Sequence, residues 1–257
     1  MRFASLGSGS KGNGTLVACG DDVLLIDCGF TLKEAERRLA NHGVSGEDLS
    51  AVLVTHEHGD HIRSVGALAR RYKLPVYASF GSRVAVDQGR YALNGCEVVE
   101  VRPQRPFFVG EIECLPVPVP HDAREPCQFV FTWRGRVLGV LTDLGSLTPC
   151  VVESYCECDS LLLECNHDLQ MLLNGPYPTS LIRRVGGNFG HLSNEQAATL
   201  LKHCNVDRLQ HLVLSHVSEQ NNKPEHATEA VFRVVETGQE RIRVASQNEG
   251  FDWLEVV

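Results

Sequence analysis

The sequence predicts an α/β fold in which two β-sheets pack face to face and helices cover their outer surfaces. Short runs of aliphatic and β-branched residues occupy two blocks of the chain, and helical patterns follow each block. Two sheets that share one core and bury their outer faces under helices satisfy this pattern. The length of 257 residues lies near the range in which sheet-rich proteins stay whole, so we expect one domain over residues 1–257.

The first block is expected to contain both strands and helices. Ala51–Thr55 has the length and the β-branched content of a buried strand. The other expected elements, in chain order, are strands at Arg2–Leu6, Thr15–Cys19 and Val23–Ile26, helices at Leu32–Asn41 and Leu68–Tyr72, and a strand at Pro75–Ala78.

The second block is expected to be mainly strands, with two helices near its end. Ser193-Asn-Glu-Gln196 has the form of a capping box, and Pro224 suits the first turn of a helix. The expected strands are Val98–Val101, Ile112–Val119, Gln128–Trp133, Val137–Leu141, Leu161–Glu164, Leu209–Ser215 and Ile242–Ala245.

The composition is that of an ordinary globular protein. The chain has no run of about 18 apolar residues and no long apolar stretch near its start, so we expect neither a membrane helix nor a secretory signal. We therefore expect a cytoplasmic protein. The net charge of -8 argues against a general coat for nucleic acid, which draws on clustered Lys and Arg, but it does not exclude a nuclease.

Ten cysteines are spread along the chain. In a reducing compartment they are better interpreted as thiols or metal ligands than as disulfides. The densest set lacks the C-x-x-C pairs of a structural zinc site; its members are Cys150, Cys156, Cys158 and Cys165. We expect these to be separate thiols, and a second metal site is the alternative.

Residues 54–61, with the sequence VTHEHGDH, carry the strongest chemical signal. Three histidines and an aspartate follow an apolar strand within six residues, which packing does not explain. Imidazole and carboxylate are ligands that zinc and its neighbours prefer. In an extended segment alternate side chains point the same way, so His56, His58 and Asp60 can converge.

This string resembles the H-x-H-x-D-H signature of the metallo-β-lactamase superfamily, and further residues match that superfamily's pattern in chain order. The resemblance implies a four-layer αββα fold with two central mixed sheets flanked by helices. It also implies two divalent metal ions, with zinc favoured and manganese or iron as alternatives. The implied metal ligands are His56, His58, Asp60, His61, His121, Asp143 and His216.

The resemblance assigns a place to each ligand. His56, His58 and His121 would hold one metal. The second metal would be held by Asp60, His61 and His216, and Asp143 would bridge the two. Asp27, at the end of an early strand, would support a ligand histidine rather than bind metal.

Such a centre lowers the pKa of a shared water towards neutrality, so a bridging hydroxide attacks the substrate. The resemblance implies that Asp60 orients this hydroxide. Residues 187–193, GNFGHLS, resemble a motif of the ribonuclease Z enzymes in the same superfamily. By that resemblance His191 would help to protonate the leaving oxygen; the alternative is that His191 only caps the helix that follows.

Several further strings together resemble the bacterial YycJ/WalJ (VicX) group of the superfamily. They are SGSKGN from Ser8, PHDA from Pro120, LECNHD from Leu163, GHLS from Gly190 and LSHVS from Leu214. Gly59, Cys165 and Val217 depart slightly from that group's pattern, and none is an expected ligand. The resemblance implies exonuclease activity on DNA, in the 5′-to-3′ direction.

Residues outside the metal ligands are expected to contact substrate. The glycine-rich loop Gly7–Gly14 could present backbone N–H groups and Lys11 to a phosphate, although a flexible turn fits it equally well. The expected contacts are Ser10, Lys11, Asn13, His167, His191, Asn221 and Asn222. For His167, a supporting or purely structural role is equally expected.

We therefore expect a metal-dependent hydrolase that acts on nucleic acid, with DNA as the favoured partner and no membrane partner. Two alternatives remain. The same two-metal centre permits hydrolysis of a small ester, lactone or thioester. A regulator that binds metal without catalysis is the other alternative, and the intact ligand set argues against it.

Overall fold

The computed structural model describes residues 1–257 and contains two seven-stranded sheets. The first sheet is formed mainly by the N-terminal part of the chain. Its order is β14 (Phe251–Glu255), β1 (Arg2–Gly7), β2 (Gly14–Cys19), β3 (Asp22–Ile26), β4 (Ala51–Leu53), β5 (Val76–Ser79) and β6 (Val98–Val101). β3 to β6 run parallel, whereas β1 pairs antiparallel with both β2 and β14.

The second sheet is formed by the C-terminal part of the chain. Its order is β13 (Ile242–Val244), β12 (His211–Ser215), β11 (Ser160–Glu164), β10 (Arg136–Leu141), β9 (Cys127–Trp133), β8 (Ile112–Pro118) and β7 (Phe107–Val109). β10 to β13 run parallel, so the carboxyl ends of these strands meet at one edge of the sheet.

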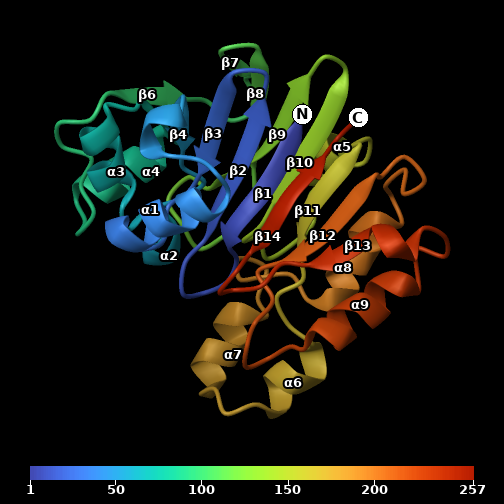
Figure 1. Ribbon diagram of the computed structural model, residues 1–257. Helices are drawn as coiled ribbons and strands as arrows, with labels where there is room; N and C mark the ends of the chain where they lie inside the picture. Colours follow the sequence, from blue (N-terminus) through green and yellow to red (C-terminus); the bar gives the residue numbers. More distant parts are fainter.

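Helices cover both outer faces of the two sheets (Figure 1). Over the first sheet lie α1 (Leu32–Asn41), α3 (Val65–Tyr72) and α4 (Phe80–Asp87), with the short α2 (Gly59–Ile62) at its end. Over the second lie α5 (Pro149–Tyr155), α8 (Asn194–Leu201) and α9 (Pro224–Phe232). The predicted αββα fold is confirmed, as is the capping box at Ser193 and the start of a helix at Pro224.

Side chains alternate along each central strand, so one strand contributes both to the core between the sheets and to the core under the helices. Successive side chains of a strand point to opposite faces. In β11, Leu162 packs between the sheets, whereas Leu161 and Leu163 pack under the helices. In β3, Leu24 and Ile26 pack between the sheets in the same way. The central strands are therefore apolar on both faces, which is why the sequence showed near-continuous apolar runs.

The structure contains elements that the sequence pattern did not predict. α6 (Leu169–Asn174) and α7 (Thr179–Val185) project from one end of the sandwich as a small lobe (Figure 1). They are too short to show a clear helical period. β7, β14, α4 and α5 were also not predicted, and the predicted strand Ala51–Thr55 ends at Leu53. No helix is long and apolar enough to cross a membrane.

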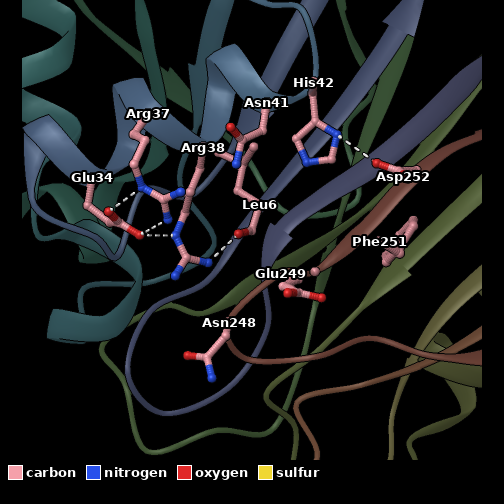
Figure 2. Close-up of a pocket in the computed structure, with 11 residues that line it drawn as sticks. Leu6, Glu34, Arg37, Arg38, Asn41, His42, Asn248, Glu249, Phe251 and Asp252 are labelled. Atoms are coloured by element: carbon pink, nitrogen blue, oxygen red, sulfur yellow. Dashed lines mark hydrogen bonds and ion pairs between the residues drawn. The ribbon is translucent and has the colours of Figure 1, made fainter.

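A polar cavity of about 700 Å³ lies between α1 and the turn before β14, and none of the predicted metal ligands lines it (Figure 2). Beside it, Arg38 pairs with Glu34 and donates hydrogen bonds to the carbonyl oxygens of Leu6 and Gln247. The Gln247 amide bonds the backbone of the glycine-rich loop at Lys11. Arg38 therefore anchors the turn that holds this loop.

Candidate metal centre

The site lies where strands of both sheets end. Asp27 follows β3, Asp143 lies just after β10, and His216 follows β12. All three have left-handed backbone conformations, with φ of 61°, 52° and 51°. Non-glycine residues rarely adopt such conformations, and those that do are often found at functional sites. The backbone therefore turns sharply at three strand ends and aims these side chains inward.

The histidine-rich segment is held against the end of β3. Thr55 donates from its backbone N–H and its hydroxyl to the two carboxylate oxygens of Asp27, at 2.9 and 2.7 Å. The Asp60 carbonyl lies so close to Gly29 that a Cβ there would overlap it. A side chain at position 29 would push the segment away, so the glycine is required by close approach.

One donor group consists of His56, His58 and His121. The distance from His58 Nδ1 is 3.1 Å to His56 Nε2 and 3.2 Å to His121 Nε2. His121 Nδ1 lies 2.9 Å from the Gly190 carbonyl oxygen, which can only accept a hydrogen bond. The proton of His121 is therefore on Nδ1, and the lone pair of Nε2 faces the other two rings.

Asp143 lies between the group of His56, His58 and His121 and the buried His216 with its neighbouring carboxylate. Asp143 Oδ2 is 3.2 Å from His61 Nε2, and Oδ1 is 3.0 Å from His216 Nδ1. Asp143 belongs to two groups of donors that could hold a cation; one is His56, His61 and Asp143, and the other is Asp143, Glu164, His191 and His216. Asp143 Oδ2 is buried without a hydrogen-bond partner, as expected of a metal-bridging oxygen.

Glu164 was not predicted as a site residue. It ends β11, is completely buried, and its Oε1 lies 2.8 Å from His191 Nδ1 and 3.1 Å from His216 Nδ1. The backbone N–H groups of Leu144 and Leu192 donate to its other oxygen. A carboxylate that ends an apolar strand was the available signal, but one such residue is weak evidence by itself.

Asp60 lies at the edge of the cluster. Its Oδ2 is 3.5 Å from His61 Nε2, and it belongs to none of the three donor groups. The amide of Asn13 lies 3.3 Å from Asp60 Oδ2 and 3.0 Å from His61 Nε2. Asn13, predicted as a substrate contact, therefore contacts two predicted metal ligands instead. That Asp60 binds metal and orients the hydroxide stays a prediction.

The pKa shifts differ between the two sides of the cluster. Burial lowers the pKa of His56 well below its ordinary value, and burial also lowers that of His121. Burial acts in the same direction on His216, but Asp143 and Glu164 outweigh it and raise its pKa to about 10. One side thus offers neutral imidazoles as ligands, while the carboxylates on the other attract positive charge; both properties suit a cation.

Asp27 accepts from the ring of His61, with 2.7 Å between Asp27 Oδ2 and His61 Nδ1. We expect Asp27→Asn to weaken metal binding about 10- to 100-fold, because removal of such a supporting carboxylate frees the ligand ring. Competition with a chelator would measure the change. Asp21→Asn, at an exposed position, is the control, and unchanged affinity in Asp27→Asn would contradict the role.

A pocket of about 320 Å³ opens beside the cluster. Of the predicted substrate contacts, Ser10, His191 and Asn221 line it. Its lining is Ser10, His58, Gly59, Asp60, Asp143, Asn166, Tyr177, Arg184, Val185, His191, His216, Ser218 and Asn221. Tyr177 and Arg184, from the α6–α7 lobe, were not predicted, because short helices gave no sign that the lobe folds over the site.

The remaining predicted contacts do not line this pocket. Lys11 pairs with Glu219 at 2.6 Å. Asn222 is buried and bonds Asn194 and the backbone of Cys165. His167 is also buried, and burial lowers its pKa to about 4. Most N–H groups of the glycine-rich loop bond within the protein, so a phosphate cradle there is not supported.

The ten cysteines are free thiols, and none belongs to a group of donors that could hold a metal. This arrangement agrees with the prediction of separate thiols at Cys150, Cys156, Cys158 and Cys165. The candidate metal centre is therefore built from histidines and carboxylates alone.

Comparison with known proteins identifies the class. The family model described as "Beta-lactamase superfamily domain" matches residues 23–217. The chain therefore belongs to the β-lactamase superfamily. Among solved structures, the metallo-β-lactamase fold protein YhfI from Bacillus subtilis superposes with a TM-score of 0.75 at 20% identity, covering 99% of both chains. At that identity the likeness shows the shared fold.

Two curated relatives are similar over most of their length. The chain is 35% identical over 238 residues to exodeoxyribonuclease YycJ of Bacillus anthracis, covering 92% of this chain and 89% of the relative. It is 33% identical over 231 residues to exodeoxyribonuclease WalJ of Streptococcus pneumoniae, covering 88% and 85%. The predicted resemblance to the YycJ/WalJ group is confirmed.

Proposed function

We propose that this protein is a metal-dependent exodeoxyribonuclease. The observation that carries the proposal is the convergence of predicted ligands from both sheets at one pocket, with Glu164 and His191 beside them. Relatives named as exodeoxyribonucleases and aligned over most of the chain support the choice of substrate.

The donor set fits two divalent cations. We propose that His56, His58 and His121 hold one ion, that Asp60, His61 and His216 hold the other, and that Asp143 bridges them. When bound, such ions polarise a phosphodiester and activate a water molecule. Zinc is the first choice because histidine and carboxylate ligands suit it, and manganese or iron accept the same ligands.

The chain's own residues would complete the reaction. Glu164 holds His191 through Nδ1 at 2.8 Å, so the other ring nitrogen is free for the pocket that His191 lines. As water forms a new bond to phosphorus, the bond to the leaving 3′-oxygen breaks. His191 would give its proton to that oxygen, and each released nucleotide would keep its 5′-phosphate.

The lining of the pocket favours a phosphodiester over a small apolar ester. Apart from Tyr177 and Val185 its members are polar, charged or glycine. A volume of about 320 Å³ lies at the small end of ligand pockets, which suits removal of one nucleotide at a time. We also propose 5′-to-3′ polarity and a cytoplasmic location, since ten free thiols are typical of a reducing compartment.

We expect the protein to degrade DNA with added Mn²⁺, and to degrade matched RNA and an aryl ester more slowly. The assay compares 5′-phosphorylated double-stranded DNA, RNA of the same sequence and the ester, before and after chelation and metal return. End-labelled DNA would show the polarity. Hydrolysis of the ester alone, by a protein that carries two metals, would contradict the nuclease proposal and favour an esterase.

A further inference from the structure

Arg184 is the one lysine or arginine among the residues that line the pocket beside the candidate metal centre. It lies in the last turn of α7, on the lobe that projects from the sandwich (Figure 1). The other charged residues of the lining, apart from histidines, are the carboxylates of Asp60 and Asp143. In a chain with net charge -8, Arg184 is therefore the protein's own positive charge for a phosphate here.

One N–H group of the Arg184 guanidinium is hydrogen-bonded within the protein, and the others are free. Its Nε lies 2.5 Å from Asp122 Oδ2. An arginine has five N–H groups, and the four on the terminal nitrogens of Arg184 have no acceptor in the protein. The side chain is 60% exposed. Two of these parallel N–H groups can bind a phosphate as a bidentate pair.

Asp122 places this guanidinium beside the first histidine group. It follows His121 directly, and its Oδ1 lies 3.5 Å from His121 Nε2 and 3.7 Å from His58 Nε2. The end of α7 is also tied to the catalytic segment, because the His191 N–H donates to the Val185 carbonyl at 2.8 Å. Arg184, His121 and His191 are therefore held in fixed relation by contacts across 70 residues of chain, from 121 to 191.

We propose that Arg184 binds a phosphate of the nucleic-acid strand in this pocket, and that Asp122 positions its guanidinium for that task. The inference rests on the proposed nuclease function and names the residue that recognises the polyanion. A side chain held by Asp122 loses less conformational freedom when the strand enters, so more of the binding energy is retained.

The test measures KM, kcat and the salt dependence of KM on 5′-phosphorylated DNA for four single variants and one double variant. Arg184→Gln should raise KM about 10- to 100-fold, the range for a lost hydrogen bond to a charged group, with little change in kcat. The slope of log KM against log salt should fall by about one. Arg184→Lys should recover part of the affinity, and Arg183→Gln, an exposed neighbour, should match the wild type.

Asp122→Asn should raise KM less than Arg184→Gln does. If Asp122 acts through Arg184, adding Asp122→Asn to Arg184→Gln should cause no further rise in KM. Metal content should be unchanged in the Arg184 variants. An unchanged KM and salt slope in Arg184→Gln would overturn the inference, as would a fall in kcat alone.

A separate measurement distinguishes this inference from the proposed function. Fluorescence anisotropy of a labelled 5′-phosphorylated oligonucleotide gives the dissociation constant without cleavage. If the wild type binds but does not cut, the nuclease proposal fails, and weaker binding by Arg184→Gln would still support the role of Arg184. Equal binding by the two proteins would overturn that role whether or not the wild type cuts.

Discussion

Asp143→Ala should lower kcat/KM for DNA by at least about 10³-fold, which corresponds to about 4 kcal/mol of transition-state stabilisation. Asp143 is the one carboxylate that belongs to two of the donor groups, and its side chain is 2% exposed. Its loss would leave His61 and His216 without the carboxylate that lies 3.2 and 3.0 Å from their ring nitrogens. Activity and metal content by mass spectrometry would be measured on the same samples.

The Asp143→Asn variant tests the negative charge of Asp143 while the size and shape of the side chain stay nearly the same. It keeps one oxygen but removes the negative charge, so we expect it to lose at least one metal and most activity as well. Asp207→Ala, at an exposed position, should keep both. A fully active Asp143→Ala protein with two metals per chain would exclude Asp143 as the bridging ligand.

His191→Ala should lower kcat about 10²- to 10⁴-fold, the range for loss of a general acid, while both metals stay bound. Burial raises the pKa of Glu164, but His191 and His216 outweigh it and lower that pKa, so Glu164 is ionised and accepts from the His191 ring. The imidazole is thereby oriented with one nitrogen towards the pocket. In His191→Ala, the pH profile of kcat should lose the limb that reflects ionisation of the general acid.

Glu164→Gln should reproduce part of the His191→Ala defect, because the neutral amide would orient His191 less strongly. His203→Ala, at an exposed position outside the pocket, is the matched control. Loss of metal from His191→Ala would contradict the general-acid role. It would instead make His191 a ligand, as its place in a donor group with Asp143 and His216 permits.

The parts of the site that sequence predicted are those with local signals. The VTHEHGDH string places four predicted ligands within one short segment. For Asp143 and for His216, the apolar strand before the residue marks its position at a sheet edge. A single His or Asp at a strand end is weak evidence for a metal ligand. Because the superfamily's ligands follow a fixed order along the chain, the predicted ligands supported one another. The same apolar runs predicted both sheets.

The parts that sequence did not predict depend on contacts between distant segments. Nothing near Glu164 shows that it will meet His191 and His216, and nothing near Arg184 shows that Asp122 will anchor it. Lys11 was expected at a phosphate, but its charge is paired with Glu219. Such partners are set by loop packing, which no local period or propensity encodes.

The division of the donors between the two sheets has a consequence for stability. His56, His58, Asp60 and His61 come from the half of the molecule that contains the first sheet, and His121, Asp143 and His216 follow β8, β10 and β12 in the half that contains the second sheet. A cation held by both halves favours the docked arrangement over any state in which they separate, by about 2.7 kcal/mol at a free concentration 100 times its dissociation constant. The ion would stabilise the fold as well as take part in the reaction. The first measurable effect of a core substitution far from the pocket would then be weaker binding of the metal.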